Sequence, residues 1–271
     1  MLKLELKRGL KRKTFIFAFL LFLTVTVFDC IKYNYSNIIS AKFINENFLY
    51  DVSKGASFSP FGGFFVFRTT SLSNLLFILM PVLVAMGYSD SYLEDMNSGF
   101  LKSILIRASK KTYLISKYLA NFIIAGITTA VPLLIDLIII VTTQPAIKPD
   151  MFSSNTFFQG SMAVNLYMNH PIIFILLWIF IYFMFSGAIA SITLAFSNFI
   201  RNKFIVVILP FIILQAYAII GQFIDIYKFD PNVFLKNPSY GYLGCVFITF
   251  IVMMVITFIP YYLGGRKNEI F

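Results

Sequence analysis

Residue types that carry out covalent chemistry are scarce in this chain. It has one histidine, His170, and two cysteines, Cys30 and Cys245. We expect the cysteines to be free thiols, and the alternative is a disulfide between them. A single histidine excludes a histidine-rich metal site, and no nucleophile and base form a recognisable pair. The phosphate-binding pattern G-x-x-x-x-G-K-S/T is absent, because the only glycine pair beside a base, at 264–265, closes the last apolar run. We therefore expect no catalytic residue, no metal and no cofactor in the chain itself.

Charged side chains suited to binding gather in the segment 89–111. Acidic, glycine, apolar and basic residues follow one another there: Asp90, Glu94 and Asp95; Gly99; Phe100, Leu101, Ile104 and Leu105; Arg107, Lys110 and Lys111. The apolar four share one helical face by their spacing. Acids near the start of a helix and bases near its end favour a short helix along a membrane surface. We expect this helix to offer its apolar face to a partner protein; the alternative is that it packs under its own bundle.

Residues 1–13 also combine charge with periodicity. Leu2, Leu6 and Leu10 recur every four residues. A parallel stripe of bases runs beside them: Lys3, Lys7, Arg8, Lys11 and Arg12. This pattern predicts an amphipathic helix in the plane of the lipid headgroups, and the plainer interpretation is a basic anchor for the segment that follows.

The composition places these segments beside a lipid bilayer. Hydrophobic residues make up 59% of the 271 residues and charged residues only 13%. A soluble protein cannot hide so much apolar surface, so the ordinary soluble enzymes, disordered chains and disulfide scaffolds are excluded. Continuous apolar runs exclude a transmembrane barrel, whose strands alternate. The net charge of +10 then indicates cytoplasmic loops rather than a nucleic-acid partner.

Six apolar stretches are long enough to cross a bilayer as helices. They are 15–31, 72–88, 118–141, 172–196, 204–224 and 242–263. We predict one all-α, polytopic permease-like domain over 1–271, with the first stretch retained as a span rather than cleaved as a signal peptide. The short stretch 58–67 holds Pro60, Gly62 and Gly63 and is expected to be interfacial or re-entrant.

The distribution of bases predicts the orientation. The termini and the loops after the second and fourth spans hold about twice as many Lys and Arg as the other loops, in fewer residues. We therefore expect a cell-membrane protein with both termini in the cytoplasm.

A few polar and small residues interrupt the spans. Asp29, Asp136 and Asp225 fall near the expected outer ends, where they are either simple interfacial acids within reach of water or an acidic rim that attracts a cationic cargo. Gln215 and Gln222 share one face and suggest a polar pathway, a contact between subunits or a hydrogen bond within the bundle. Small residues on the fourth span predict close helix packing, with Gly126 on the third: Ser186, Gly187, Ala190 and Ser191.

The segment 94–120 resembles the permeases of type-2 ABC exporters. In that family an acidic residue and a glycine lead into a short coupling helix, a basic cluster and a Lys-Tyr-Leu at the start of the third span. The matching residues are Glu94, Asp95, Gly99, Leu101, Ile104, Leu105, Arg107, Lys110, Tyr113, Leu114, Lys117, Tyr118, Leu119 and Ala120. The number of spans and the N-terminal helix match over the whole chain. One departure is Ala108-Ser109, where the family usually has a proline, which puts the end of the coupling helix in doubt.

The resemblance implies a transporter whose motor is a separate protein. Two ABC ATPase subunits would bind ATP and magnesium and dock on Glu94, Asp95, Gly99, Phe100, Leu101, Ile104, Leu105 and Arg107. A second permease chain, identical or not, would complete the pathway, and the cargo would be a peptide or an antibiotic-like amphipathic molecule. The alternative is an ATP-independent secondary transporter or channel, which predicts charges in mid-span and an internal repeat, and neither is evident.

Overall fold

The computed structural model describes residues 1–46, 61–106, 109–144, 149, 161–224, 226–238 and 242–267. Within these ranges the regular structure is helical throughout, without strands. The all-helical prediction is therefore confirmed for the described part of the chain. Arg107 and Asp225 lie outside it, as does the side chain of Leu105.

Six helical stretches are long and apolar enough to cross a membrane, as the sequence predicted. They are Lys13–Ser36, Ser71–Asn97, Lys110–Thr143, Pro171–Phe196, Lys203–Phe223 and Leu243–Arg266. They correspond to helices α2 (Lys13–Glu46), α4 with α5 (Ser71–Tyr88 and Ser91–Asn97), α7 (Lys110–Thr143), α9 (Pro171–Phe196), α10 (Lys203–Phe223) and α12 (Leu243–Lys267). The third helix starts at Lys110 rather than at 118, because the Ser109 hydroxyl accepts a hydrogen bond from the Thr112 N–H and caps it.

Helices α7 and α9 pack closely at the centre of the bundle. Gly126 faces the ring of Phe183, and Gly187 faces the ring of Phe122; a Cβ at either glycine would lie 2.4 Å from a ring carbon. The Thr129 and Ser186 hydroxyls are hydrogen-bonded at 2.7 Å across the same contact. The predicted close packing through small residues is confirmed, and only glycine at 126 and 187 lets the aromatic rings interlock.

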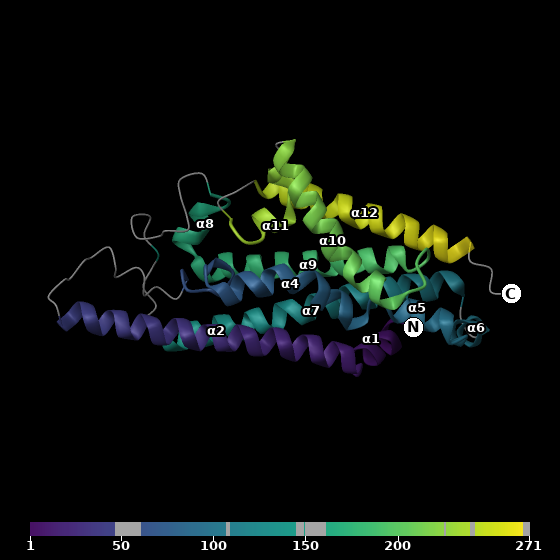
Figure 1. The fold of residues 1–271 in the computed structure, drawn as a ribbon, viewed down its shortest axis with the longest axis horizontal. Helices are drawn as coiled ribbons and strands as arrows, with labels where there is room; N and C mark the ends of the chain where they lie inside the picture. The colour runs from purple at the N-terminus through teal and green to yellow at the C-terminus, as the bar shows by residue number, and fades with distance from the viewer. Residues whose placement is uncertain are drawn as a thin grey trace.

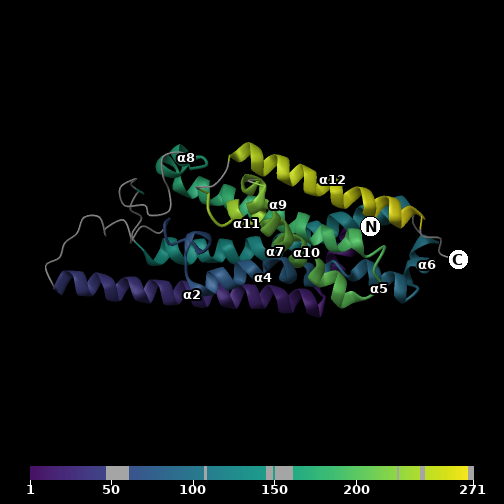
Figure 2. The ribbon, with the colours of Figure 1, turned by 45° about the horizontal axis from the view of Figure 1, so that its top comes forward.

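The bundle is elongated (Figures 1 and 2). The helices α1 (Leu2–Leu10), α5 and α6 (Phe100–Leu105) and the end of α12 lie at one end, here called the terminal end. Lys110 Nζ donates to the Arg266 carbonyl at 3.0 Å there and ties α7 to α12. Helix α8 (Val164–Asn169) lies at the opposite end, and α10 is inclined to the other long helices (Figure 1).

Short elements close the end opposite to the termini. The described part of the predicted 58–67 piece is a turn followed by the 3-10 helix η2 (Phe65–Phe67), whose side chains are buried in the main hydrophobic core. Between α10 and α12, η3 (Tyr227–Phe229) and α11 (Pro231–Phe234) fold over the bundle. The Leu235 carbonyl after α11 accepts hydrogen bonds from Trp178 Nε1 at 3.1 Å and Tyr182 Oη at 3.2 Å, which anchors this cover to α9.

Candidate functional site

A cluster of charges, buried except for Arg8, joins α1, α5 and α7 at the terminal end. Its ionic members are Glu5, Arg8, Asp95 and Lys117, and we call it the α1–α5–α7 charge cluster. Arg8 Nη2 lies 2.6 Å from Asp95 Oδ1, and Lys117 Nζ lies 2.6 Å from Asp95 Oδ2. Lys117 also pairs with Glu5 at 3.1 Å. The side chains of Asp95 and Lys117 are wholly buried, so these pairs act in a low dielectric medium.

Two tyrosines complete the hydrogen bonding of the cluster. Tyr113 Oη donates to Asp95 Oδ2 at 2.6 Å, and Tyr88 Oη donates to the Glu5 carboxylate. The ammonium of Lys117 lies 4.7 Å from the centre of the Tyr88 ring. Two acids therefore face two bases, and each acid also accepts a hydrogen bond from a tyrosine hydroxyl, which favours a stable ion pair.

Arg8 shows how strongly the cluster favours its charges. Burial alone would lower the pKa of its guanidinium, but the hydrogen bond and the charge of Asp95 outweigh burial and raise that pKa above the ordinary value. The guanidinium also lies 4.9 Å from the centre of the Phe100 ring, which links the cluster to the first residue of α6.

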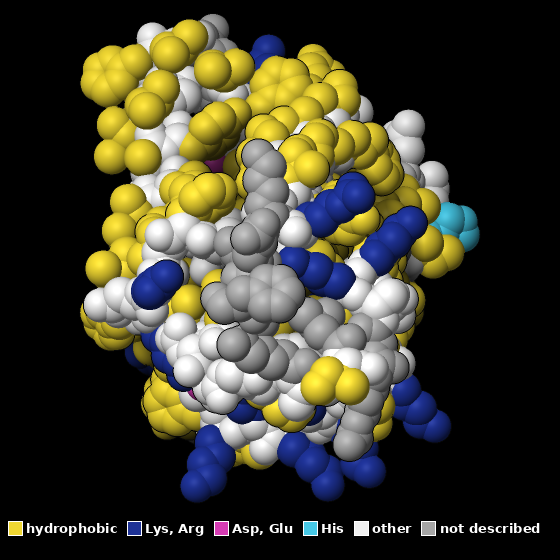
Figure 3. Space-filling model, turned by 90° about the vertical axis from the view of Figure 1, so that its right-hand side faces the viewer, with side chains coloured by type: hydrophobic (Ala, Val, Ile, Leu, Met, Phe, Trp, Pro, Cys, Tyr) yellow, Lys and Arg dark blue, Asp and Glu magenta, His cyan; other side chains and the backbone are white. Residues whose placement is uncertain are grey.

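A second, more exposed set of ion pairs surrounds this cluster. Arg12 contacts Asp90 at 2.6 Å and Glu94 at 2.7 Å. Lys203, at the start of α10, pairs with the same two acids. All the acids of 90–95 are thus neutralised by bases from other elements, and none of the acidic side chains whose burial is described is exposed. Figure 3 looks onto the terminal end and shows basic side chains gathered on its surface.

Helix α6 turns two residues of its predicted docking face inward. Leu101 is 5% exposed and packs with Tyr92, Tyr113 and Tyr261, and Ile104 packs against the same cluster. Gly99 adopts a left-handed φ of 70° and separates α5 from α6, so the acids and the apolar residues lie on two helices instead of one.

Two residues of the predicted docking set are not accessible at the surface of the chain. Asp95 and Leu101 are buried, because the bundle supplies both the cations and the aromatic surface that they need. Glu94 is partly buried in its ion pairs. Outward-facing side chains of α6 and its end are Phe100, Ser103 and Ile106, of which Ile106 is 87% exposed.

Helix α1 also differs from the predicted surface helix. Its buried residues are Glu5 and Gly9, whereas Leu10 of the leucine stripe is 41% exposed. Arg8 and Arg12 pair with acids of the loop, and their contact with lipid headgroups stays a prediction. Lys3, Lys7 and Lys11 are exposed and remain free to face headgroups. Sequence reasoning missed this pairing, although a glutamate within the basic segment was a local signal for it.

The predicted acidic rim does not reach water. Asp29 and Asp136 are both 0% exposed and share the buried guanidinium of Arg68, at 3.1 Å and 2.7 Å. Burial opposes the charge of Arg68, but the charge of Asp136 and the hydrogen bonds to both acids raise the pKa of that guanidinium. Sequence reasoning missed Arg68 because nothing local links it to either acid.

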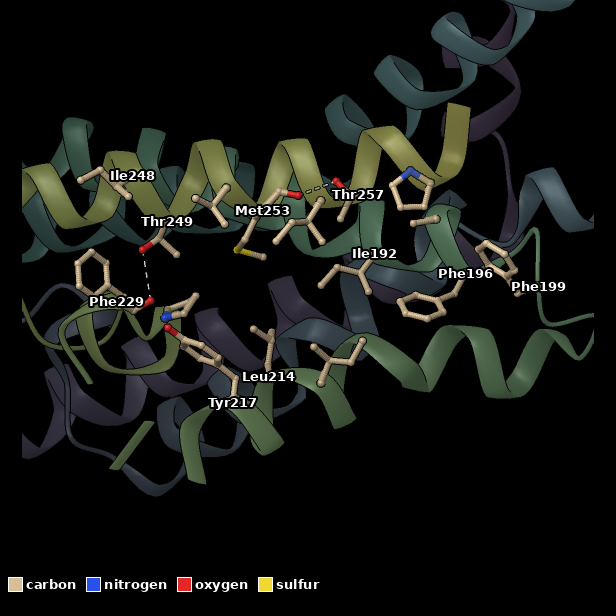
Figure 4. A pocket seen from close by; sticks show the side chains of 16 residues that line it. Ile192, Phe196, Phe199, Leu214, Tyr217, Phe229, Ile248, Thr249, Met253 and Thr257 are labelled. Carbon is tan, nitrogen blue, oxygen red and sulfur yellow. Dashed lines mark hydrogen bonds between the residues drawn. The ribbon is translucent and has the colours of Figure 1, made fainter. Parts of the chain in front are cut away.

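An apolar cavity of about 680 Å³ lies between α9, α10 and α12. Figure 4 shows its walls, which include Leu214 and Tyr217 from α10 and Met253 from α12. The threonine hydroxyls on its wall are used within the protein: Thr249 donates to the Phe229 carbonyl at 3.3 Å, and Thr257 donates to the Met253 carbonyl at 2.8 Å. The volume falls within the range of about 300–1,000 Å³ that is usual for small-molecule pockets.

The predicted pathway residues lie outside this cavity. Gln215 is half-buried and Gln222 is exposed, and neither lines it. The part of α10 that does line the cavity, with Ile213, Leu214 and Tyr217, is apolar and gives no sequence signal that separates it from an ordinary core face.

Chemistry beyond binding has no candidate in the described ranges. No group of three or more His, Cys, Asp or Glu residues there could hold a metal ion, and the cysteines are free thiols. In comparisons with known proteins, no family model, curated protein or solved structure matches the chain.

Proposed function

We propose that this chain is the membrane subunit of an ATP-driven, type-2 ABC exporter. In this proposal two separate ATPase subunits supply ATP and magnesium chemistry, and a second permease chain completes the pathway. Both termini face the cytoplasm of a cell membrane, α1 lies at the headgroups, and α6 is the coupling helix. The observation that carries the proposal is the α1–α5–α7 charge cluster, which ties α5, the helix next to α6, to the membrane-crossing helix α7.

The surface charge of the terminal end supports this orientation. The exposed bases at this end include Lys3, Lys7, Lys11, Lys13, Lys111, Arg201 and Arg266. Bases collect on the cytoplasmic side of membrane proteins, while the acids of this end are hidden in ion pairs. The terminal end is therefore the side on which a cytoplasmic motor would bind.

The contacts of α6 describe how a motor could act on the bundle. An ATPase would bind the outer face at Phe100, Ser103 and Ile106. Leu101 and Ile104 on the inner face pack against tyrosines of α5, α7 and α12. A displacement of α6 would thus reach α7 through packed side chains and through the Asp95–Lys117 pair. Nucleotide binding can drive transport only if the motor contacts α6 differently in its two states.

Replacing Ile106 by aspartate tests the docking face. We expect an ATPase to co-purify with the unchanged protein in mild detergent. With Ile106→Asp we expect the amount of that ATPase to fall by about tenfold or more, because a charge would replace an exposed apolar contact. The measurement is ATP hydrolysis and mass spectrometry of the complex that is purified through this chain.

Two control variants make this test specific. Ile106→Val keeps the apolar contact and should retain the motor, and Leu4→Asp places the same charge at an exposed site on α1. Purification of the active protein without any ATP-hydrolysing partner, or equal retention by all three variants, would contradict the proposal and favour an ATP-independent transporter or channel.

The α10–α12 cavity supports a cargo with an apolar part. Its two threonine hydroxyls are already hydrogen-bonded, so it offers a ligand mainly hydrocarbon surface, together with the Tyr217 hydroxyl and no charge. An amphipathic peptide or antibiotic-like molecule could place an apolar group there, with a gain of about 25 cal/mol for each Å² of apolar surface removed from water.

Filling the cavity should reduce binding of such molecules. Ile213 lines it and is 36% exposed, so Ile213→Trp can occupy the space without breaking the core. We expect at least a tenfold weaker affinity for an apolar fluorescent probe, measured by titration of the purified protein. Ile212→Trp is the matched control, because the adjacent side chain is 58% exposed and does not line the cavity. Equal loss in both variants would place the probe elsewhere.

A further inference from the structure

Three buried side chains form a separate ionic cluster away from the terminal end. Arg68 Nη1 donates to Asp29 Oδ2 at 3.1 Å, and Arg68 Nη2 donates to Asp136 Oδ1 at 2.7 Å. All three side chains are 0% exposed. We call them the Arg68 cluster; it holds the segment that ends at Arg68 between α2 and α7.

The Arg68 cluster lacks one positive charge. Two carboxylates share one guanidinium here, whereas in the α1–α5–α7 charge cluster two acids meet two bases. The other titratable groups near it are Cys30 and Tyr33 from α2, neither of them a cation. Lys236, which follows α11, lines a small cavity with Phe65 and Ser73 but pairs with neither acid. In the part of the chain that the structure describes, no second base pairs with either acid. An uncompensated charge in such a site is costly.

The hydrogen bonds of the two carboxylates differ. Asp136 accepts from Arg68 at Oδ1 and from the Phe65 N–H at Oδ2, the latter at 2.9 Å. Asp29 accepts at Oδ2 only, and its buried Oδ1 has no hydrogen-bond partner among the described residues. A proton bound between the two carboxylates would remove the excess negative charge. The Asp29 carboxyl group, whose Oδ1 has no hydrogen-bond partner, could then be neutral.

We propose that the Asp29–Asp136 pair is a proton-binding site that holds one proton in the folded protein. The proton belongs to the pair, since two acids that share one cation titrate together. With this proton bound, the two acids carry one negative charge together. That charge balances the positive charge of Arg68, so the cluster is neutral. Loss of the proton would restore the uncompensated charge and weaken the attachment of the 61–68 segment to α2 and α7.

The proposal predicts a direction for the pH dependence of stability. Aspartates in an unfolded chain lose their protons near pH 4, at about 3.9. The folded protein then binds one more proton than the unfolded chain at neutral pH. Stability must fall as the pH rises through the titration of the pair, by up to about tenfold in the folding equilibrium constant for each pH unit.

Infrared spectroscopy of the purified protein in detergent and deuterated buffer tests the site directly. We expect the carbonyl band of a protonated carboxyl group at neutral pH, and its loss in Asp29→Asn and in Asp136→Asn, because either substitution leaves one acid for Arg68. Asp95→Asn is the matched control; this acid is equally buried but faces two bases, so the band should persist.

The wild-type spectrum keeps the test decisive even if a variant fails to fold. Absence of the band at neutral pH would overturn the proposal and mean that another cation neutralises the pair. A band that disappears in Asp95→Asn but remains in Asp29→Asn would overturn it equally. The thermal stability of the wild type should fall with rising pH while the band persists and should level off as the band disappears, and a different relation between the two curves would reject the link to stability.

Discussion

Replacing Lys117 by methionine is expected to destabilise the folded protein by about 3–5 kcal/mol. Methionine keeps much of the volume of the side chain but removes its charge. Asp95 and Glu5 would then share only Arg8, and Asp95 is wholly buried. The lost free energy is that of leaving a buried carboxylate without its closest cation. This loss is larger than the net stability that the intact ion pair contributes.

The single tryptophan provides the measurement. Trp178 is wholly buried on α9, so its fluorescence during denaturant unfolding in mixed micelles reports the folded fraction. Lys203→Met is the matched control, because Lys203 also pairs with acids of 90–95 but is 45% exposed, and exposed pairs contribute little. Equal destabilisation by the two variants would show that burial does not govern the strength of these pairs.

A double variant separates the ion pair from the shape of the site. Asp95→Asn combined with Lys117→Met removes both partners, so its free-energy loss should be clearly smaller than the sum of the two single losses. Additive losses would mean that the side chains act independently and that α5 and α7 are not coupled through them.

Replacing Arg68 by methionine is the second large effect, with an expected loss of about 3–5 kcal/mol. Two buried carboxylates would lose their common cation, and the Gly63 carbonyl would lose the donor Arg68 Nε at 2.5 Å. Trp178 is again the probe, because Phe67 contacts Phe174, which stacks on Trp178 at 5.5 Å.

Arg68→Lys distinguishes charge from geometry. A lysine keeps the charge but cannot bridge two carboxylates with a planar fork, so it should recover only part of the lost stability. Arg201→Met, at an exposed arginine, should leave the unfolding curve unchanged. Full stability of Arg68→Met would contradict the role of the ionic cluster in holding the 61–68 segment.

Local features were predictable from the sequence because a bilayer imposes local rules. Each crossing helix must satisfy its own backbone and present apolar side chains over its length, so hydropathy located all six spans to within a few residues at most ends. Close packing at Gly187 was predictable for the same reason, since small residues at helical spacing permit close approach whatever the partner. The partner ring, Phe122, was not predictable.

What the sequence alone determined is therefore the all-helical, six-span plan and the basic character of the terminal end. The tertiary structure alone decided which charges meet. Lys117 pairs with Glu5 across 112 positions, and Arg68 pairs with Asp136 across 68. Helical periodicity relates residues three or four positions apart, whereas these pairs depend on how separate helices pack. For that reason acids predicted to face a motor or the outer water lie buried against bases.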